Sequence, residues 1–362
     1  MNANKKIFIT DCEGPISKND NAYELTEHFV PNGDSLFALI SKYDDVQADI
    51  VRRKGYKAGD TLRLILPFLK AYGVTNKKIK EFSAENILLV PHAKDTLKFV
   101  RGVMSSFIVS TSYEQYIQAL CNVIDFPSEN VYCTKLNIDK YQISKTEEGK
   151  LQKLGEEIVA MSMIKFPISA VGLDDFSEKD KKTIRRLDEI FWKEISEMNC
   201  GKMLKEVNPV GGFEKAKTIQ EIVAKLSAKL RDVMYVGDSI TDVQSFQLVR
   251  DNGGLAVSFN GNNYAVREAE IVVLSEIAIV TSVLAEVFSN YGKKGVLELV
   301  KEWSFSGLKK YCPPILQGQM SRLYPEALPK VEIITSANKE RLMKESTIFR
   351  KTVRGEKVGG LG

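Results

Sequence analysis

The sequence predicts an α/β fold in which a Rossmann-like, mostly parallel sheet is interrupted by helical insertions. Short apolar and β-branched runs alternate with helical patterns, and several of these runs lack the polar alternation of a half-exposed strand. Strands of that kind are typical of a parallel sheet that is covered on both faces. The chain has 362 residues, and chains beyond about 250–300 residues usually divide into more than one domain.

Six runs are expected to form the strands. They are residues 6–10, 106–111, 131–138, 233–237, 255–259 and 271–274. Helical patterns, such as residues 113–124 and 218–230, fill the intervals between them. Ligands of an open α/β sheet bind beyond the carboxyl ends of its strands. The residues that follow these strands are therefore the first candidates for a functional site.

Two stretches break the alternation and predict insertions over the sheet. Only helical patterns occur between Ile16 and Leu88, and a second helical block lies between Asp139 and Glu206. The predicted parts are a catalytic core (1–17, 88–138 and 206–290), a helical cap (18–87), a second helical insertion (139–205) and a helical C-terminal extension (291–362). The basic tail of the extension, which ends in a glycine-rich stretch, is predicted to be disordered.

Composition argues against several classes of site. The five cysteines form no C-x-x-C pair and there are only two histidines, which argues against zinc or disulfides and favours a reducing cytoplasm. The net charge is +4, and the stretch from Lys339 to Lys357, with seven Lys or Arg against three Glu, accounts for it. The neutral body lacks the basic face that nucleic-acid binding requires. Neither a signal peptide nor a membrane span is expected.

Two carboxylates follow the first predicted strand. Asp11 and Glu13 are separated by one residue, so on an extended chain both side chains point the same way and Cys12 points the other way. Like charges this close repel each other unless a cation or a shared proton lies between them. The pair therefore indicates either a cation site or a solvated strand end.

The fourth predicted strand also ends in acids. Gly237 permits a tight turn, and Asp238 and Asp242 share a face if a helix begins near Ser239. A capping aspartate followed by a surface aspartate has the same spacing. The pattern indicates a functional site because it lies at the end of another strand of the same sheet.

Two further polar residues lie at comparable positions. Ser110, the last hydroxyl before the turn after the second strand, is either free to donate to an anion or bonded to its own backbone. Ser112, with Gln115, is expected to begin the next helix as a capping box. Lys215 lies at a helix start, on the same face as the apolar Ile219. A lysine there is unfavourable with the helix dipole, but the same position is suited to binding an anion.

In chain order, these residues resemble the motifs of the haloacid dehalogenase (HAD) superfamily, chiefly its phosphatases and phosphotransferases: Asp11 and Glu13, Ser110, Lys215, then Asp238 and Asp242. The resemblance spans roughly Ile7 to Val273, and the helical block after Asp11 lies where the phosphoserine-phosphatase-like branch carries a cap. Most phosphatases of the superfamily have aspartate where this chain has Glu13. Glutamate there resembles the branch that contains phosphoserine phosphatase/homoserine phosphotransferase. More distantly, the chain resembles an archaeal HAD-like family labelled as subunit R of an energy-converting hydrogenase A.

The resemblance implies a Mg²⁺-dependent phosphatase of a small phosphorylated metabolite. Asp11 would form an aspartyl-phosphate, and Glu13 would protonate the leaving oxygen and later deprotonate water. Asp11 and Asp238 would hold Mg²⁺, helped by the carbonyl of Glu13, and Asp242 would either bind the ion or orient the groups that bind it. Ser110 and Lys215 would bind the phosphoryl oxygens.

Several alternatives remain open from the sequence. Phosphoryl transfer to a bound alcohol would replace hydrolysis if the cap excludes water. The longer side chain of Glu13 would leave activity weak if the backbone does not compensate for it. The hydrogenase label implies a non-catalytic subunit of a larger complex. The C-terminal extension is a candidate surface for a homodimer or for docking an acidic protein partner through its basic tail.

Overall fold

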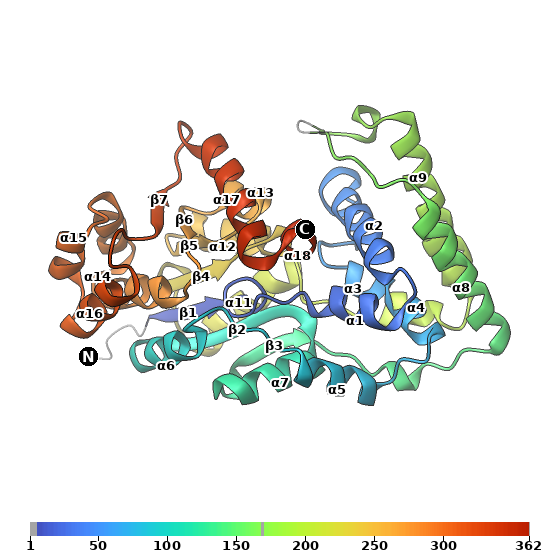
Figure 1. The fold of residues 1–362 in the computed structure, drawn as a ribbon, viewed down its shortest axis with the longest axis horizontal. Coiled ribbons are helices and arrows are strands. Elements are labelled where there is room, and N and C mark those ends of the chain that lie inside the picture. Colours follow the sequence, from blue (N-terminus) through green and yellow to red (C-terminus); the bar gives the residue numbers. More distant parts are fainter. Residues whose placement is uncertain (1–5, 168–169, 362) are drawn as a thin grey trace.

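The computed structural model describes residues 6–167 and 170–361, and it contains the predicted α/β sheet with helices on both faces (Figure 1). The strands lie in the order β3-β2-β1-β4-β5-β6-β7, with β1 to β6 parallel and β7 antiparallel to β6. Their bounds are β1 (Ile7–Thr10), β2 (Ser105–Tyr113), β3 (Val131–Thr134), β4 (Val233–Gly237), β5 (Leu255–Phe259), β6 (Ile271–Leu274) and β7 (Lys330–Ile333). All six predicted strands are present, the third is shorter than predicted, and β7 was not predicted.

Helices cover both faces of the sheet because successive strand residues point to opposite sides. Phe8 packs into one core, while Ile7 and Ile9 pack into the other. The Phe8 side is covered by α6 (Ala93–Val103), α7 (Glu114–Ile124) and α14 (Ile279–Lys301). The opposite side is covered by α11 (Phe213–Lys225), α12 (Val243–Asp251) and α13 (Asn263–Glu268).

The two predicted insertions pack together as one helical unit, called the cap below, on the right in Figure 1. The first supplies α1 (Asn21–Phe29), α2 (Gly33–Asp45), α3 (Thr61–Leu64), α4 (Leu66–Ala71) and α5 (Asn76–Glu85). The second supplies α8 (Lys145–Ala160), α9 (Glu178–Glu189) and α10 (Gly201–Glu206). They share one hydrophobic core, in which Phe191 of the second insertion stacks on Tyr43 at 5.8 Å and meets Phe68 edge-on at 6.2 Å. Neither insertion buries its apolar face without the other.

The C-terminal extension packs on the sheet core. After α14 come α15 (Phe305–Tyr311) and α16 (Pro314–Leu323), whose apolar residues join the core on the Phe8 side of the sheet. Trp303 packs there as well, and its indole N–H donates to Pro329 O at 2.8 Å. Packing onto the core therefore accounts for the aromatic residues of this region.

The prediction of a disordered basic tail is wrong for the described residues. Its residues form α17 (Lys339–Arg354) and α18 (Glu356–Gly359). Leu342 is buried against Val266, Val272 and Leu274, and Leu361 is buried in the cap. The sequence suggested disorder because α17 is mostly polar, but the buried Leu342, Ser346 and Arg350 fix this helix to the rest of the chain.

Among the described residues, no helix combines the length and the apolar character needed to cross a membrane.

Candidate active site

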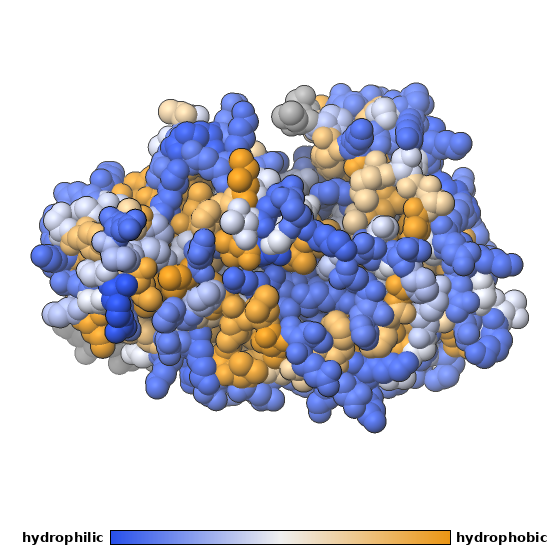
Figure 2. Space-filling view, viewed as in Figure 1, coloured by the Kyte–Doolittle hydropathy of each residue, from blue (hydrophilic) through white to orange (hydrophobic). Residues whose placement is uncertain are grey.

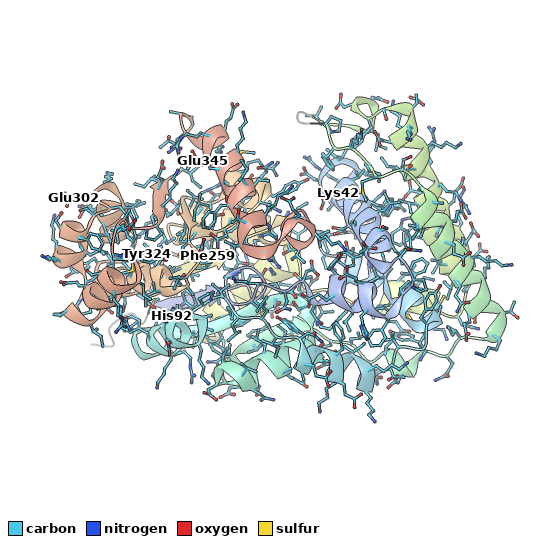
Figure 3. All side chains as sticks on the ribbon, viewed as in Figure 1. Lys42, His92, Phe259, Glu302, Tyr324 and Glu345 are labelled. Carbon is cyan, nitrogen blue, oxygen red and sulfur yellow. The ribbon has the colours of Figure 1, made fainter. Side chains whose placement is uncertain are left out.

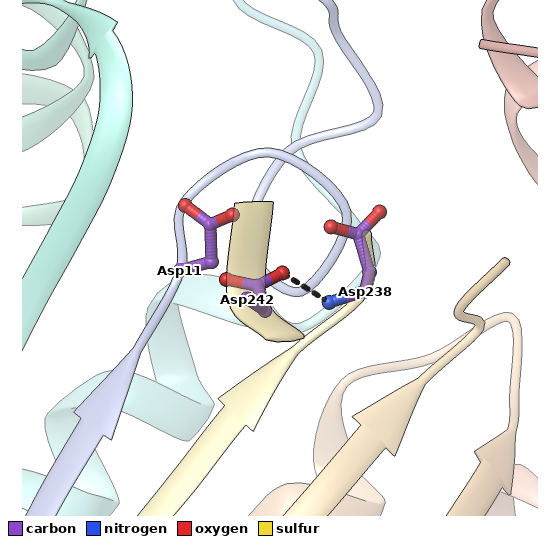
Figure 4. A group of neighbouring side chains, drawn as sticks. All are labelled: Asp11, Asp238 and Asp242. Carbon is purple, nitrogen blue, oxygen red and sulfur yellow. Dashed lines mark hydrogen bonds between the residues drawn. The ribbon is translucent and has the colours of Figure 1, made fainter. Parts of the chain in front are cut away.

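Three acidic side chains meet at the carboxyl edge of the sheet (Figure 4). β1 and β4 are parallel neighbours, so Asp11 after β1 and Asp238 after β4 lie side by side, and Asp11 N donates to Val236 O at 2.8 Å. Asp242 closes the short 3-10 turn Ile240–Asp242 that follows β4. One carboxylate oxygen from each of the three residues lies within 4.8 Å of the others. The structure therefore brings together three of the four predicted metal-binding residues, and the Glu13 carboxylate is not among them.

Lys215 lies between two of these carboxylates. Its ammonium donates to Asp11 Oδ2 at 2.6 Å and to Asp242 Oδ1 at 2.7 Å. The side chain is fully buried near the start of α11, on the face predicted from the helical pattern. Burial disfavours its charge, but attraction to Asp11 and Asp242 raises its pKa above the usual value. Lys215 is therefore a fixed cation within the acidic cluster.

Asp242 and Asp11 differ in their ionisation. Burial opposes the charge of Asp242, but Lys215 and hydrogen bonds from Tyr235 and the Asp238 amide lower its pKa overall. Burial raises the pKa of Asp11 to about 7, although Lys215 lowers it. Asp242 is thus held as a carboxylate more firmly than Asp11 is.

Two glycines allow these side chains to approach the backbone. Gly14 has φ +99, and a Cβ on it would lie 2.2 Å from Asp238 Oδ2. A Cβ on Gly237 would lie 2.5 Å from Asp242 Cγ. Any larger residue at either position would push a carboxylate out of the cluster.

Glu13 faces the same cavity from the loop after β1. Its Oε1 accepts from Asn21 N at 2.6 Å, at the start of cap helix α1. Burial raises the pKa of Glu13 well above its usual value, and the neighbouring Asp20 raises it further. This loop folds tightly, since Gly14 N donates to Ser17 O at 2.7 Å.

The serines after the second strand behave differently from the prediction. Ser112 does not begin a helix: it belongs to β2, and α7 begins at Glu114 without a side-chain cap. The register of β2 against β3 shifts between Val109 and Tyr113, and the strand continues past this irregularity. Ser110 is buried and its hydroxyl donates to Ser112 Oγ at 3.1 Å, while the adjacent Thr111 lines the cavity.

The cavity in front of Asp11 has a volume of about 90 Å³ and lies between core and cap. The cap supplies Asp44 and Asp45 from the end of α2, and the loop before α1 supplies Asp20. The C-terminal segment supplies Arg350, Arg354 and Leu361. None of these residues was singled out from the sequence. Their helical spacing is ordinary, so only the packing of cap and tail against the core reveals them.

The donor set fits a magnesium ion. Mg²⁺ prefers carboxylate and water oxygens, and the cluster of Asp11, Asp238 and Asp242 offers three buried carboxylates within reach of one ion. Because Gly14 and Gly237 have no side chains, the carboxylates of Asp238 and Asp242 can lie against the backbone there. Soft ligands are not involved, because Cys12 is buried and its pKa is raised well above normal by burial.

A parallel sheet with an acidic cluster at its carboxyl edge, roofed by a helical cap, defines the class of the protein. The chain belongs to the haloacid dehalogenase-like hydrolases, whose family model matches residues 65–281. It is also similar to a solved structure of a gene product from Archaeoglobus fulgidus, with 28% sequence identity and a TM-score of 0.81. That similarity covers 99% of both chains, so it includes the cap and the C-terminal extension. No curated protein matches the chain.

Proposed function

We propose that the protein is a Mg²⁺-dependent phosphatase that hydrolyses a small phosphomonoester through an aspartyl-phosphate on Asp11. The position of Asp11 carries the proposal, since its carboxylate bonds Lys215 at 2.6 Å and lies within 4.8 Å of the Asp238 and Asp242 carboxylates. These three acids would hold the ion, with the Glu13 carbonyl as a further ligand. When bound, the ion supplies positive charge for the incoming phosphoryl group.

Asp11 and Glu13 divide the chemistry between them. One oxygen of Asp11 attacks phosphorus, so that a bond from Asp11 to phosphorus forms and the bond to the leaving alcohol breaks. Glu13 donates its proton to the leaving oxygen, and its raised pKa favours the protonated form that this step needs. Glu13 then takes a proton from the water that attacks phosphorus, which releases phosphate and restores Asp11.

Lys215 and Ser110 are proposed to bind the phosphoryl oxygens. Lys215 is already aligned on Asp11 and would move little during the reaction, a property that favours stabilisation of the transition state. The Ser110 hydroxyl would have to leave Ser112 to reach a phosphoryl oxygen. Thr111, on the cavity wall, is the alternative hydroxyl.

A panel of phosphomonoesters assayed with and without Mg²⁺ tests the proposal. We expect phosphate release from at least one small substrate, dependent on Mg²⁺ and abolished by Asp11→Asn. Absence of turnover on every substrate, in protein shown by calorimetry to have bound the metal, would instead favour a non-catalytic subunit of a larger complex.

Phosphoryl transfer to an alcohol is the second candidate function. The small cavity of about 90 Å³ between core and cap favours it, because a site with room for little water also protects an aspartyl-phosphate from hydrolysis. Candidate amino alcohols added at saturating concentration should then appear as phosphorylated products. Release of inorganic phosphate alone would exclude those acceptors.

A further inference from the structure

The C-terminal segment, residues 339–361, crosses from the core to the cap beside the active site. Figure 3 labels Glu345 on α17, the core end of this segment, and Lys42 on cap helix α2. α17 rests on the core, with the Thr347 hydroxyl donating to Asn263 Oδ1 at 2.9 Å. Beyond it, Lys357 pairs with Glu27 and Asp34 of the cap at 2.9 and 3.1 Å. The surface in Figure 2 is indented along its upper edge between these two parts.

Two arginines of α17 reach the acidic cluster. Arg350 and Arg354 both bond Oδ2 of Asp238, the latter at 3.1 Å. Both side chains are 4% exposed. They are two of the seven basic residues that were predicted to lie in a free tail. Both contact the carboxylate of Asp238, which is predicted to bind metal.

Arg354 also holds the loop that carries Glu13. Arg354 Nε donates to Lys18 O at 3.0 Å, and a second nitrogen of Arg354 bonds Asn19 O. Arg350 is less completely bonded, because its Nε is buried without a hydrogen-bond partner among the described residues. An unpaired buried donor carries a desolvation cost, which makes the Arg350 contact easier to give up.

We propose that the C-terminal segment is an autoinhibitory strap: Arg350 and Arg354 act as an internal cation on Asp238, and the strap withdraws before a divalent cation and a phosphorylated substrate bind. The inference rests on the proposed function. A guanidinium pair and a divalent ion on one carboxylate repel each other, so the two arrangements compete. With the strap in place, the cavity in front of Asp11 has a volume of about 90 Å³, which is smaller than the roughly 150 Å³ of a cavity that binds benzene.

The cap end of the strap is held by contacts that are individually weak. The ion pairs of Lys357 are exposed, with 65% of the lysine side chain accessible, and such pairs contribute little in salt. Beyond α18 the segment adds one buried apolar side chain, Leu361. The core end, anchored by Leu342 and Ser346, stays in place when the other end withdraws.

Binding of Mn²⁺, measured by calorimetry on full-length protein, tests the competition directly. Arg350→Gln and Arg354→Gln should each tighten Mn²⁺ binding by about tenfold to a hundredfold, the range of one charged hydrogen bond. Arg341→Gln is the matched control, because Arg341 lies on the same helix and pairs on the surface with Glu332 and Glu345. It should leave Mn²⁺ binding unchanged.

Two further measurements keep the proposal testable if the arginine variants fail to fold. Lys357→Glu, which breaks only the cap end, should tighten Mn²⁺ binding by a few-fold. Trypsin should cut the wild-type protein after Lys351, Arg354 or Lys357 faster when Mg²⁺ and inorganic phosphate are present. Unchanged cleavage would show that the segment does not withdraw and would overturn the strap. Weaker binding of Mn²⁺ or phosphate in the arginine variants would show that the arginines belong to the working site, and it would overturn the strap as well.

These outcomes separate the strap from the phosphatase activity. Tighter metal binding in variants that turn over no substrate would support the strap and contradict the proposed function. Turnover with metal affinity unchanged in all three variants would support the function and overturn the strap.

Discussion

Two groups of buried carboxylates face each other across the cavity, one from the sheet and one from the cap. In the sheet group, Lys215 bonds both Asp11 and Asp242. In the cap group, Asp44 accepts from Gly59 N at 2.9 Å and Asp45 pairs with Lys42 at 3.2 Å. Burial raises the pKa of both Asp11 and Asp44 to about 7. Burial alone therefore does not distinguish a reactive carboxylate from a structural one.

The difference lies in what fixes each group. Parallel strands bring Asp11 and Asp238 to one edge of the sheet, where backbone pairing of β1 with β4 sets their separation. The cap acids sit at the end of α2, and their position depends on helix packing and on closure of the cap. The sheet group is thus suited to chemistry that tolerates little displacement.

Asp11→Asn should have the largest effect. We expect turnover of any phosphomonoester that the wild type hydrolyses to fall at least about a thousandfold, because an amide is a poor nucleophile. Phosphate release at saturating Mg²⁺ measures the loss. Asp125→Asn, on the surface where Asp125 pairs with Lys94, is the control and should keep wild-type activity. A variant of Asp11 within tenfold of wild type would remove Asp11 from the chemistry.

Lys215→Met should lower both activity and stability. It leaves the buried carboxylates of Asp11 and Asp242 without their cation, and removal of one partner of a buried pair costs about 3–5 kcal/mol. We expect urea unfolding to show a loss of this size, with turnover reduced about a hundredfold. Lys217→Met on the same helix is the matched control, since Lys217 is exposed and its one ion pair, with Glu221, is long at 3.9 Å. Equal effects of the two substitutions would contradict the role of Lys215.

Gly14→Ala tests how finely the sheet group is placed. A Cβ at Gly14 would lie 2.2 Å from Asp238 Oδ2, so the carboxylate must move, and a displacement near 1 Å costs on the order of a hundredfold in rate. Gly55→Ala in the cap separates this clash from backbone strain. Gly55 also has positive φ, at 75, but a Cβ there meets nothing within 4 Å. Steady-state rates should therefore fall about tenfold to a hundredfold in the first variant and stay unchanged in the second. Similar rates in both would mean that Asp238 tolerates displacement.

The sheet and its acidic edge were predictable from the sequence because their signals are local. Strands without polar alternation mark a covered parallel sheet, and the residues after each strand must gather at one edge. Asp11, Asp238 and Asp242 were identified in this way, and Lys215 from the face of its helix. The structure places these four together.

The cap acids and the C-terminal arginines were not predictable because their positions depend on contacts between distant segments and leave no local signal. Asp44 and Arg350 lie on helices whose polar residues look solvated, and only contacts between distant segments bury them. Ser112 was misassigned because its capping-box spacing is satisfied equally well by a strand that continues after a register shift. The edge strand β7 lacks a distinctive pattern, since Val331 is its one buried residue and the other three are only partly buried.

Asp44→Asn should have the smallest effect on activity and a pH-dependent effect on stability. The folded-state pKa of Asp44 is about 7, above its value of 3.8 in an unfolded chain, so the folded protein retains a proton that the unfolded chain releases between these pH values. Deprotonation of Asp44 therefore lowers the free energy of unfolding of the wild type as pH rises from about 4 to 7. Asparagine carries no charge, so the variant does not show this decrease. We expect the variant to match the wild type near pH 4, where Asp44 of the wild type is protonated, and to exceed it by on the order of 1–3 kcal/mol at pH 8, measured by urea unfolding without metal. Asp174→Asn, at an exposed cap position, should follow the wild-type pH profile at both values. Turnover of Asp44→Asn should stay within about tenfold of wild type, since the proposed mechanism assigns Asp44 no bond to the reacting atoms. If its turnover instead collapses as in Asp11→Asn, the cap carboxylates take part in the chemistry and the distinction between the two groups fails.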